Sequence, residues 1–436
     1  MNLYAVTGNP ILHSKSPNIF NEIISKNKLE AVYFRLAADN AKEAISIFKS
    51  LQLKGMNVTA PFKTEIIELL DEVDVEAKKI NAVNTIVNIS GKLKGFNTDF
   101  IGVTESFKDQ GIDLNKKKCV IIGAGGAGKA AVYGMHKAGA EIIIIDIDEK
   151  TAQSVATEFG CLAKPNKELE VHVRQSEIIV YAVDAALVEA VKEEWITKNH
   201  VIYDVNYKPS FLNNIVKNKG CKLITGAEML INQAIPGYEY YFGTTPDKSI
   251  MWNGFHQQIA DKKKKTIALI GFMGCGKTSV GKALAAKFNY TFIDMDDEIV
   301  NKNGMSINDI FKTKGEAEFR KIEHDILKNK IKKENVIISC GGGIILNKEN
   351  RTLLKENALT FWLYNSIETS VSRANDGTRP LLNTINPLVN AKNLFESRKE
   401  FYADAADMLV NTENKNIAEV TEKIYAEINK TFGNKR

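Results

Sequence analysis

The stretch Thr266-Ile-Ala-Leu-Ile-Gly271-Phe-Met-Gly-Cys-Gly-Lys-Thr278 joins a short apolar run to a glycine-rich loop. The run predicts a buried strand, and the loop fits the pattern GxxxxGK[ST] that connects such a strand to a helix. Glycines such as Gly274 and Gly276 let backbone N–H groups turn into one concavity that holds phosphate at the helix N-terminus. Lys277 would neutralise the β- and γ-phosphates, and Thr278 would offer its hydroxyl to Mg²⁺. We therefore predict a site for a nucleoside triphosphate.

Around this loop, apolar strand-like runs alternate with helical stretches over the whole chain of 436 residues. Such alternation predicts an α/β fold with largely parallel sheets. The polar segment 257–265 interrupts the pattern and ends in four consecutive lysines. Because it lacks hydrophobic periodicity, we expect it to be a linker between a first domain, residues 1–256, and a second domain, residues 266–436.

The composition excludes several classes of protein. Hydrophobic residues make up 44% and charged residues 25%, which is typical of a soluble globular protein, and a net charge of +5 argues against a nucleic-acid site. The five cysteines include no CxxC pair, so neither a disulfide framework nor a zinc site is indicated. No apolar run reaches the roughly 20 residues of a membrane span. We expect a cytoplasmic protein whose partners are small molecules.

The next strand-like run after the loop ends in Phe292-Ile-Asp294-Met-Asp296-Asp297. If the strand continued through these residues, Asp294 and Asp296 would project to one face at the carboxyl edge of the sheet. One carboxylate could then reach the Mg²⁺ shell while the other met a substrate hydroxyl. Capping of the following helix by these acids is an equally simple interpretation.

Five further motifs follow in order: Gly315-Glu-Ala-Glu-Phe-Arg320-Lys-Ile-Glu323, Cys340-Gly-Gly-Gly343, Arg373, Gly377-Thr-Arg379-Pro-Leu-Leu382 and Arg398-Lys-Glu-Phe-Tyr402. With the glycine loop and the paired acids, the series resembles shikimate kinase from Lys265 to the C-terminus. The resemblance implies a P-loop kinase fold with a parallel sheet, in which ATP phosphorylates the 3-hydroxyl of shikimate.

The resemblance also implies roles for individual residues. Asp296, Arg320, Gly342, Gly343 and Arg398 would bind shikimate, the two arginines through its carboxylate. Asp296 would in addition orient the reacting hydroxyl or act as general base, and Lys277 would assist the transfer. Asp294 would act through Mg²⁺ together with Thr278. Arg379 would stabilise the transferring phosphoryl group, and Arg373 would lie against the adenine.

In the first half, Gly123-Ala-Gly125-Gly126-Ala-Gly128 follows the strand-like run 118–122 and precedes a helical stretch. A GxGxxG pattern in this context predicts a dinucleotide whose pyrophosphate lies at a helix N-terminus. A close-packed turn without a ligand is the alternative.

Upstream, polar side chains gather at the ends of predicted elements. Ser14 and Ser16 lie in Asn9-Pro-Ile-Leu-His-Ser-Lys-Ser-Pro17, where they could receive a carboxylate, although Ser16 could instead cap a helix. Three more polar segments follow: Asn57-Val-Thr59-Ala-Pro-Phe-Lys63, Asn81-Ala-Val-Asn84-Thr85 and Gly95-Phe-Asn-Thr-Asp99. Together they suggest a polyhydroxylated substrate, and they resemble shikimate dehydrogenase over about Met1–Phe255.

This second resemblance implies a two-lobed dehydrogenase with a Rossmann-like nucleotide lobe. The substrate lobe would comprise residues 1–100 plus about 230–256, and the dinucleotide-binding lobe residues 101–229. Lys63 and Asp99 would be the catalytic pair that reduces 3-dehydroshikimate with NADH or NADPH. The implied substrate-binding residues are Ser14, Ser16, Thr59, Asn84, Tyr207 and Gln233.

Two positions depart from the family pattern. Asp146 follows the second strand of the nucleotide lobe, where the family has a basic residue for the 2′-phosphate of NADP. A carboxylate there accepts from a free 2′-hydroxyl and repels a phosphate, so we predict a preference for NADH; a solvated acid at a strand end is the alternative. The segment Tyr181-Ala-Val-Asp184 also lacks the family's usual residues near the nicotinamide.

These observations predict a bifunctional enzyme that reduces 3-dehydroshikimate to shikimate and then phosphorylates shikimate with ATP and Mg²⁺. The alternative is an active kinase fused to a dehydrogenase-like module that is non-catalytic or specific for quinate. The intact Lys63 and Asp99 argue against a non-catalytic module.

Overall fold

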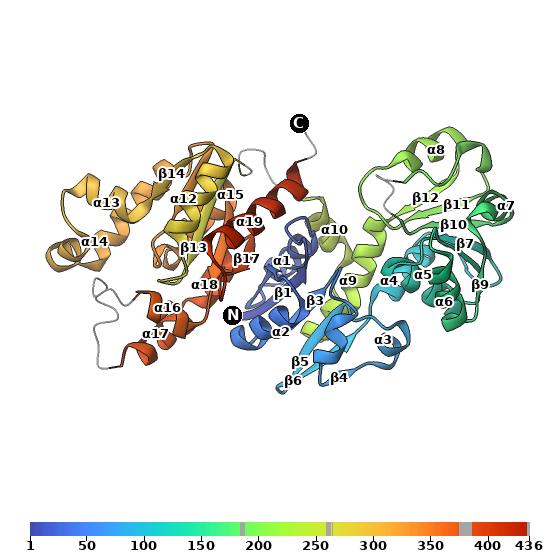
Figure 1. Cartoon of the computed structure of the whole chain (residues 1–436), viewed down its shortest axis with the longest axis horizontal. Helices are drawn as coiled ribbons and strands as arrows, with labels where there is room; N and C mark the ends of the chain where they lie inside the picture. The colour runs from blue at the N-terminus through green and yellow to red at the C-terminus, as the bar shows by residue number, and fades with distance from the viewer. Residues whose placement is uncertain (184–187, 259–262, 264, 375–385, 434–436) are drawn as a thin grey trace. The chain divides into compact units, whose positions relative to one another are not determined.

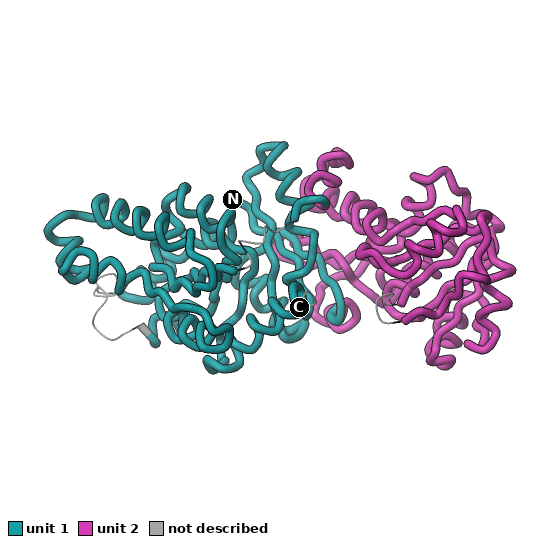
Figure 2. The backbone as a smooth tube through the Cα atoms, turned by 90° about the horizontal axis from the view of Figure 1, so that it is seen from above, with its two compact units in different colours: residues 1–62, 256–436 teal, residues 63–255 magenta. Residues whose placement is uncertain are grey.

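A computed structural model of the chain describes residues 1–183, 188–258, 263, 265–374 and 386–433. These residues form two compact units (Figures 1 and 2): residues 1–62 with 256–436, and residues 63–255. Both units are α/β, as the sequence predicts. Within the described ranges, no helix combines the length and the apolar character needed to cross a bilayer.

The first unit begins with a parallel βαβαβ segment. Strand β1 lies between β2 and β3 and pairs in parallel with both. The elements are β1 (Asn2–Gly8), α1 (Ser16–Lys26), β2 (Ala31–Ala37), α2 (Ala41–Leu51) and β3 (Gly55–Val58). Every residue of β2 is buried, because helices cover this part of the sheet.

The C-terminal part of the first unit is a parallel sheet in the order β14-β15-β13-β16-β17. Its strands are β13 (Thr266–Gly271), β14 (Thr291–Asp294), β15 (Val336–Ser339), β16 (Leu359–Tyr364) and β17 (Met408–Asn411). Its helices are α12 (Lys277–Phe288), α13 (Met295–Asn303), α14 (Ile307–Lys330), α15 (Lys348–Asn357), α16 (Ile367–Ala374), α17 (Pro387–Glu396), α18 (Lys399–Ala405) and α19 (Ile417–Phe432). The glycine loop therefore follows the central strand, as the sequence predicts.

The compact units do not follow the boundary expected at 257–265. Strand β17 pairs in parallel with β2, with Met408 opposite Arg35 and Val410 opposite Ala37, so the sheet continues through β17-β2-β1-β3. Residues 1–62 are therefore packed with the C-terminal part of the chain. Figure 1 shows β17 and α19 beside α1 and β1.

The second unit contains a small sheet and a nucleotide lobe. The small sheet consists of β4 (Glu72–Val73), β5 (Thr85–Ile89) and β6 (Lys92–Phe96), in which β5 and β6 are antiparallel. It is followed by α4 (Asp99–Asp109), and α3 (Val75–Ile80) precedes β5.

The nucleotide lobe is a parallel sheet in the order β12-β11-β10-β7-β8-β9, which is the doubly wound dinucleotide-binding order. Its strands are β7 (Lys118–Ile122), β8 (Glu141–Ile145), β9 (Leu162–Ala163), β10 (Ile178–Tyr181), β11 (Val201–Asp204) and β12 (Lys222–Thr225). Its helices are α5 (Gly126–Lys137), α6 (Glu149–Phe159), α7 (Leu169–Gln175) and α8 (Phe211–Lys219), and α9 (Gly226–Phe242) and α10 (Lys248–His256) follow.

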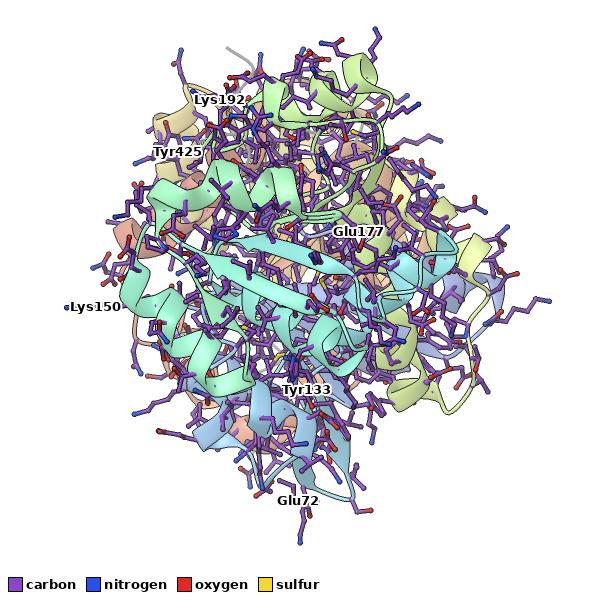
Figure 3. The ribbon with its side chains drawn as sticks, turned by 90° about the vertical axis from the view of Figure 1, so that its right-hand side faces the viewer. Glu72, Tyr133, Lys150, Glu177, Lys192 and Tyr425 are labelled. Atoms are coloured by element: carbon purple, nitrogen blue, oxygen red, sulfur yellow. The ribbon has the colours of Figure 1, made fainter. Side chains whose placement is uncertain are left out.

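Two apolar clusters fill this lobe. In one of them, the ring of Tyr133 on α5, which is labelled in Figure 3, packs edge-on against Phe100 of α4 and Phe159 of α6. These contacts fix α4, which carries Asp99 in its first turn, against the helix that follows the glycine loop.

Candidate active sites

Lys63 and Asp99 form an ion pair in the second unit, with Lys63 Nζ 2.6 Å from Asp99 Oδ2. The Asp99 side chain is 9% exposed and that of Lys63 is 24% exposed, so the ammonium group is the more accessible partner. The backbone of Asp99 is fixed at the start of α4, because its N–H donates to Asn97 Oδ1. The arrangement leaves a cation that can donate a proton and a carboxylate that orients it.

Buried amide and hydroxyl groups surround this pair. Asn84 Nδ2 donates to Asp99 Oδ1 at 2.9 Å and lies 3.3 Å from Gln233 Oε1. Thr98 links the same groups, because its N–H donates to Asn84 Oδ1 and its hydroxyl donates to Gln233 Oε1. Four residues singled out in the sequence, Lys63, Asn84, Asp99 and Gln233, therefore belong to one hydrogen-bonded network.

The network depends on the close approach of helices α4 and α9. Gly102 of α4 lies against α9, and a Cβ at this position would come within 2.8 Å of both Gln233 Cβ and the Met229 carbonyl oxygen. A side chain there would push apart the helices that carry Asp99 and Gln233.

Ser14, Ser16 and Thr59 lie in the first unit, at the carboxyl ends of β1 and β3. Ser14 Oγ lies 3.4 Å from Ser16 Oγ, and the Thr59 N–H donates to the Thr7 carbonyl. Capping by Ser16 is not what the structure shows. Helix α1 begins at Ser16, its N-cap residue is Lys15, and it has no side-chain cap hydrogen bond.

The glycine loop of the nucleotide lobe joins β7 to α5. Gly128 must be glycine, because a Cβ there would lie 2.0 Å from the Gly123 carbonyl oxygen. A Cβ on Gly125 or Gly126 would have no other heavy atom within 4 Å. Helix α5 begins at Gly126. The loop thus offers a helix N-terminus without obstructing side chains, which suits a pyrophosphate.

Asp146 lies at the carboxyl end of β8, beside this loop. Its Oδ2 accepts from the Ala124 N–H at 2.6 Å, and its Oδ1 accepts from the Asp148 N–H at 2.9 Å. The carboxylate is therefore fixed at the edge of the loop rather than solvated at a strand end, although its side chain is only partly buried.

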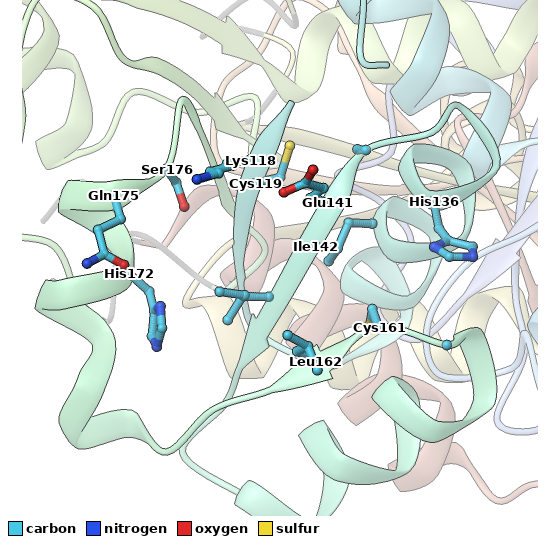
Figure 4. Close-up of a pocket in the computed structure, with 13 residues that line it drawn as sticks. Lys118, Cys119, His136, Glu141, Ile142, Cys161, Leu162, His172, Gln175 and Ser176 are labelled. Carbon is cyan, nitrogen blue, oxygen red and sulfur yellow. The ribbon is translucent and has the colours of Figure 1, made fainter. Parts of the chain in front are cut away.

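A pocket of about 750 Å³ lies at the other edge of the same sheet (Figure 4). Its lining includes Lys118 and Glu141, the first residues of β7 and β8, together with His172 of α7. Because dinucleotides bind at the carboxyl ends of the strands, this pocket is separate from the glycine loop.

Two further predictions concern residues of the second unit. Tyr207 follows β11, and its ring packs edge-on against the ring of Phe255, with the ring centroids 6.0 Å apart. In the segment of unusual sequence, Tyr181 to Val183 are described, and the Tyr181 hydroxyl accepts from the Ala190 N–H. Asp184 lies outside the described residues.

The glycine loop of the first unit contains the predicted phosphate-binding groups. Gly274 and Gly276 have φ values of 72° and 92°, which favour glycine, and α12 begins at Lys277. Lys277 Nζ donates to the carbonyl oxygens of Gly271 and Phe272 at 3.1 and 2.9 Å, so the ammonium group lies over the loop.

The predicted magnesium residues meet directly, because the Thr278 hydroxyl donates to Asp294 Oδ2 at 2.8 Å. The strand argument for Asp294 and Asp296 was wrong, however. Strand β14 ends at Asp294, which caps α13 by accepting from the Asp296 N–H, and Asp296 lies in the first helical turn. The Asp294 carboxylate therefore both caps α13 and contacts Thr278 of the glycine loop.

Arg320 lies beside the glycines that follow β15. Its Nη1 donates to Glu323 Oε2 at 2.8 Å, and a Cβ on Gly343 would lie 2.4 Å from Arg320 Nη2. Burial raises the pKa of Glu323, and Arg320 opposes this shift. Among the residues that the structure describes, Arg320 Nε is a buried donor without a partner, which suits a site that receives an anion.

Asp296 and Arg398 complete this cluster, since their charges also act on the pKa of Glu323. Arg398 is 7% exposed at the start of α18. A Cβ on Gly341 would lie 3.2 Å from Asp296 Oδ1, and the Gly342 carbonyl accepts from the Tyr402 hydroxyl at 2.6 Å. The structure thus brings the predicted shikimate-binding residues of this half together.

Two kinase predictions remain, Arg373 and Arg379. Arg373 is exposed in the last turn of α16. Arg379 lies outside the described residues. Within the described ranges, no cluster of three or more His, Cys, Asp and Glu side chains is arranged to hold a metal ion. Magnesium is commonly held by one or two protein groups together with substrate phosphates.

No role was predicted from the sequence for Thr98, Tyr402 or Gly341. Each lies inside one of the motifs quoted above, and this position is the only feature of the sequence that could have indicated a role in the site. Thr98 and Tyr402 are fully buried with their hydroxyls hydrogen-bonded to site residues, which the pattern of residue types alone does not reveal.

Three family models match the chain. The shikimate kinase model matches residues 273–429, and the shikimate dehydrogenase substrate binding domain matches residues 6–86. The model described as NADP oxidoreductase coenzyme F420-dependent matches residues 118–207. The last match covers the glycine loop of the nucleotide lobe and Asp146.

Individual relatives match the first half. Shikimate dehydrogenase (NADP(+)) of Aquifex aeolicus is 38% identical over 247 residues, which are 55% of this chain and 91% of that protein. The structure of shikimate 5-dehydrogenase from Thermus thermophilus with NADP(H) and shikimate has a TM-score of 0.54 and 30% identity, covering 58% of this chain and 98% of that one. Quinate dehydrogenase from Corynebacterium glutamicum with NAD has a TM-score of 0.55 and 26% identity, with the same coverage of both chains.

Proposed function

The chain belongs to the shikimate dehydrogenase family and carries a shikimate kinase domain behind it, and on this premise we propose how its residues perform two successive reactions. It is a bifunctional enzyme of the shikimate pathway. The first reaction reduces 3-dehydroshikimate to shikimate, and the second transfers a phosphoryl group from ATP to the 3-hydroxyl of shikimate. The single observation that carries the proposal is the Lys63–Asp99 pair in its amide and hydroxyl network, on one chain with a glycine loop whose Thr278 contacts Asp294.

In the first reaction, Lys63 donates a proton to the carbonyl oxygen, and Asp99 orients the ammonium group. The family resemblance assigns ring hydroxyls to Asn84, Gln233 and Thr59, and the carboxylate to Ser14, Ser16 and Tyr207. The reduced nicotinamide cofactor supplies the hydride when it is bound. Gly125 and Gly126 would hold its pyrophosphate, since a Cβ on either residue would meet only open space.

The relatives named above include NADP-dependent dehydrogenases, so a nicotinamide dinucleotide serves the first reaction. We propose that this chain prefers NADH. The fixed carboxylate of Asp146 would accept a hydrogen bond from a 2′-hydroxyl and would repel a 2′-phosphate.

In the second reaction, Lys277 would neutralise the phosphates of ATP, and Thr278 and Asp294 would hold Mg²⁺, which supplies positive charge to the phosphates. Arg320 and Arg398 bind the carboxylate of shikimate, for which the unpartnered Nε of Arg320 is suited. Asp296 orients the 3-hydroxyl against Gly342 and Gly343. Arg379 stabilises the transferring phosphoryl group, and Arg373 lies against the adenine.

Two substitutions test the assignment of the two reactions. Lys63→Ala should lower kcat for 3-dehydroshikimate reduction at least about 100-fold, since the general acid is lost. Lys277→Ala should lower ATP-dependent phosphorylation by a similar factor. Pyridine absorbance and ADP release measure the two rates.

The exposed Lys79 of α3 provides the matched control, and Lys79→Ala should leave both rates unchanged. A Lys63→Ala enzyme that still reduced 3-dehydroshikimate at the normal rate would contradict the proposed dehydrogenase site. Reduction of quinate-derived dehydroquinate in place of 3-dehydroshikimate would instead favour the quinate-specific alternative.

A further inference from the structure

Glu427 is a fully buried carboxylate in the C-terminal helix α19, with a relative exposure of 1%. It lies in the apolar stripe of the helix with Val420, Ile424 and Ile428, where a charged side chain is unusual. A buried carboxylate is costly unless hydrogen bonds compensate for the lost water, so its partners explain its presence.

The partners of Glu427 are backbone N–H groups of the loop that follows β1. The Ile11 N–H donates to the carboxylate at 2.9 Å, and the Leu12 N–H donates to Oε2 at 2.8 Å. The bonded groups are 416 and 415 residues apart in the sequence and belong to the same compact unit. A helix of the kinase domain therefore holds a loop of the dehydrogenase half.

A second contact fixes the same loop from β2. Arg35 Nε and Nη2 donate to the Ser14 carbonyl at 3.1 and 2.6 Å, and Arg35 Nη1 donates to the Asp407 carbonyl at 3.2 Å. Asp407 directly precedes β17. The loop is thus tied to the kinase domain both before Ser14, by Glu427, and at Ser14 itself, through Arg35.

We propose that Glu427 is a positioning residue for the dehydrogenase reaction: it fixes Ile11 and Leu12, and thereby the Ser14 and Ser16 hydroxyls that receive the substrate carboxylate. This inference rests on the proposed function, because it takes these two serines as substrate ligands. Glu427 itself does not touch the substrate. Its contribution is to reduce the disorder that the loop would otherwise lose on binding.

The test uses the full chain with Glu427→Gln. This change keeps the side-chain shape but removes the charge, and it places an NH₂ group where Oε1 accepts from the Ile11 N–H at 3.1 Å. The KM for 3-dehydroshikimate should rise roughly tenfold while kcat changes less than about threefold, because the loop binds the substrate but takes no part in proton transfer. Hydrogen exchange of a peptide that contains Ile11 and Leu12 should become faster in the same variant.

The kinase constants serve as an internal control. Helix α19 also packs on α12, where Phe288 meets Tyr425 with ring centroids 4.9 Å apart. A substitution that disturbed α19 as a whole would therefore alter the KM for ATP. Glu422→Gln is the matched variant, because Glu422 is an exposed carboxylate on the same helix that pairs with Lys287, and it should leave the dehydrogenase KM unchanged.

Three results would overturn the inference: an unchanged KM for 3-dehydroshikimate, unchanged exchange at Ile11 and Leu12, or an equal rise of the KM values in both reactions. If Glu427→Gln does not fold, Glu427→Asp retains the charge but withdraws the oxygens from the loop, and the same changes are expected. A wild-type chain that does not reduce 3-dehydroshikimate would contradict the proposed function, whereas the exchange measurement would still test the contact of Glu427 with the loop.

Discussion

Asp146 has both carboxylate oxygens engaged by backbone N–H groups at the glycine loop, yet its side chain is only partly buried. A fixed negative charge at this place should exclude a 2′-phosphate, with a repulsion on the order of 4 kcal/mol at 4 Å before screening. We expect kcat/KM for NADH to exceed that for NADPH at least tenfold. Asp146→Asn should reduce this ratio by about tenfold or more, measured at one salt concentration.

Asp148→Asn is the control for this prediction, because Asp148 is an exposed carboxylate two residues away whose Oδ1 accepts from the Lys150 N–H. It should leave the cofactor ratio unchanged. Lys150 is the first basic residue after Asp146, and its side chain extends away from the lobe in Figure 3. A wild-type enzyme with the higher kcat/KM for NADPH would show that the Asp146 charge does not decide the cofactor.

At the scale of single residues, the sequence motifs predicted the side chains of the catalytic pair. Lys63 and Asp99 were predicted from their motifs and lie 2.6 Å apart. Glu427 was missed, since its partners are backbone amides that any sequence could provide. The sequence shows only that Glu427 falls at a position where the apolar stripe of α19 would have an apolar residue. This spacing does not identify the groups that bind the carboxylate.

At the scale of elements, the contact of α4 with α9 supports the Asp99–Gln233 geometry. Gly102→Ala should force these helices apart, because the new methyl group would overlap Gln233 Cβ and the Met229 carbonyl. We expect kcat/KM for 3-dehydroshikimate to fall about tenfold or more and the melting temperature to fall by several degrees. Steady-state kinetics and thermal unfolding measure the two effects.

Lys108→Ala on the exposed face of α4 is the control, and neither quantity should change appreciably. Phosphorylation of shikimate by Gly102→Ala should also stay normal, since its groups lie in the other compact unit. Unchanged dehydrogenase activity in a folded Gly102→Ala enzyme would mean that the helices can separate without affecting the catalytic pair.

The order and type of most elements followed from apolar runs and glycine loops, but their ends did not. The expected strand through Asp296 ends at Asp294, because the Asp294 side chain caps the next helix. A sequence of alternating acidic and apolar residues fits both a strand and a capped helix start. Tertiary contacts such as Thr278 with Asp294 decide between them.

At the scale of the whole chain, β17 and β2 join residues 1–62 to the kinase domain. Lys415 strengthens this junction by pairing with Asp39 and Glu43 at 2.6 and 2.7 Å. We predict that residues 1–256 and 257–436, co-expressed as separate chains, elute together in size-exclusion chromatography. Lys415→Glu should weaken their association at least tenfold, because it would bring three carboxylates together.

The exposed Lys430 of α19 provides the control, and Lys430→Glu should leave the association unchanged. Burial opposes the pKa shifts at the junction, but the hydrogen bonds outweigh it and raise the pKa of Lys415 and lower that of Asp39. The contribution of Lys415 is lost only as pH rises through its raised pKa, and that of Asp39 only as pH falls through its lowered pKa. Association should therefore be constant through the neutral range, and separate elution of the halves there would contradict the junction.

The sequence could not predict this junction. Hydrophobic periodicity identifies β2 and β17 as strands, but it does not show which strands become neighbours when they are hundreds of residues apart. The polar segment 257–265 favoured two separate domains. The functional division at this segment remains a prediction, and it differs from the division into compact units.

The pairing of β17 with β2 also sets an order of events on the ribosome. Arg35 is synthesised 372 residues before its partner Asp407, which at about 5–20 residues per second corresponds to roughly 20–75 s. During that interval the outer edge of β2 has no neighbouring strand, and open strand edges are templates for aggregation. Strand β17, which is made near the end of synthesis, therefore completes the sheet that β1, β2 and β3 begin, so translation that stopped before β17 would leave β2 with an uncovered edge.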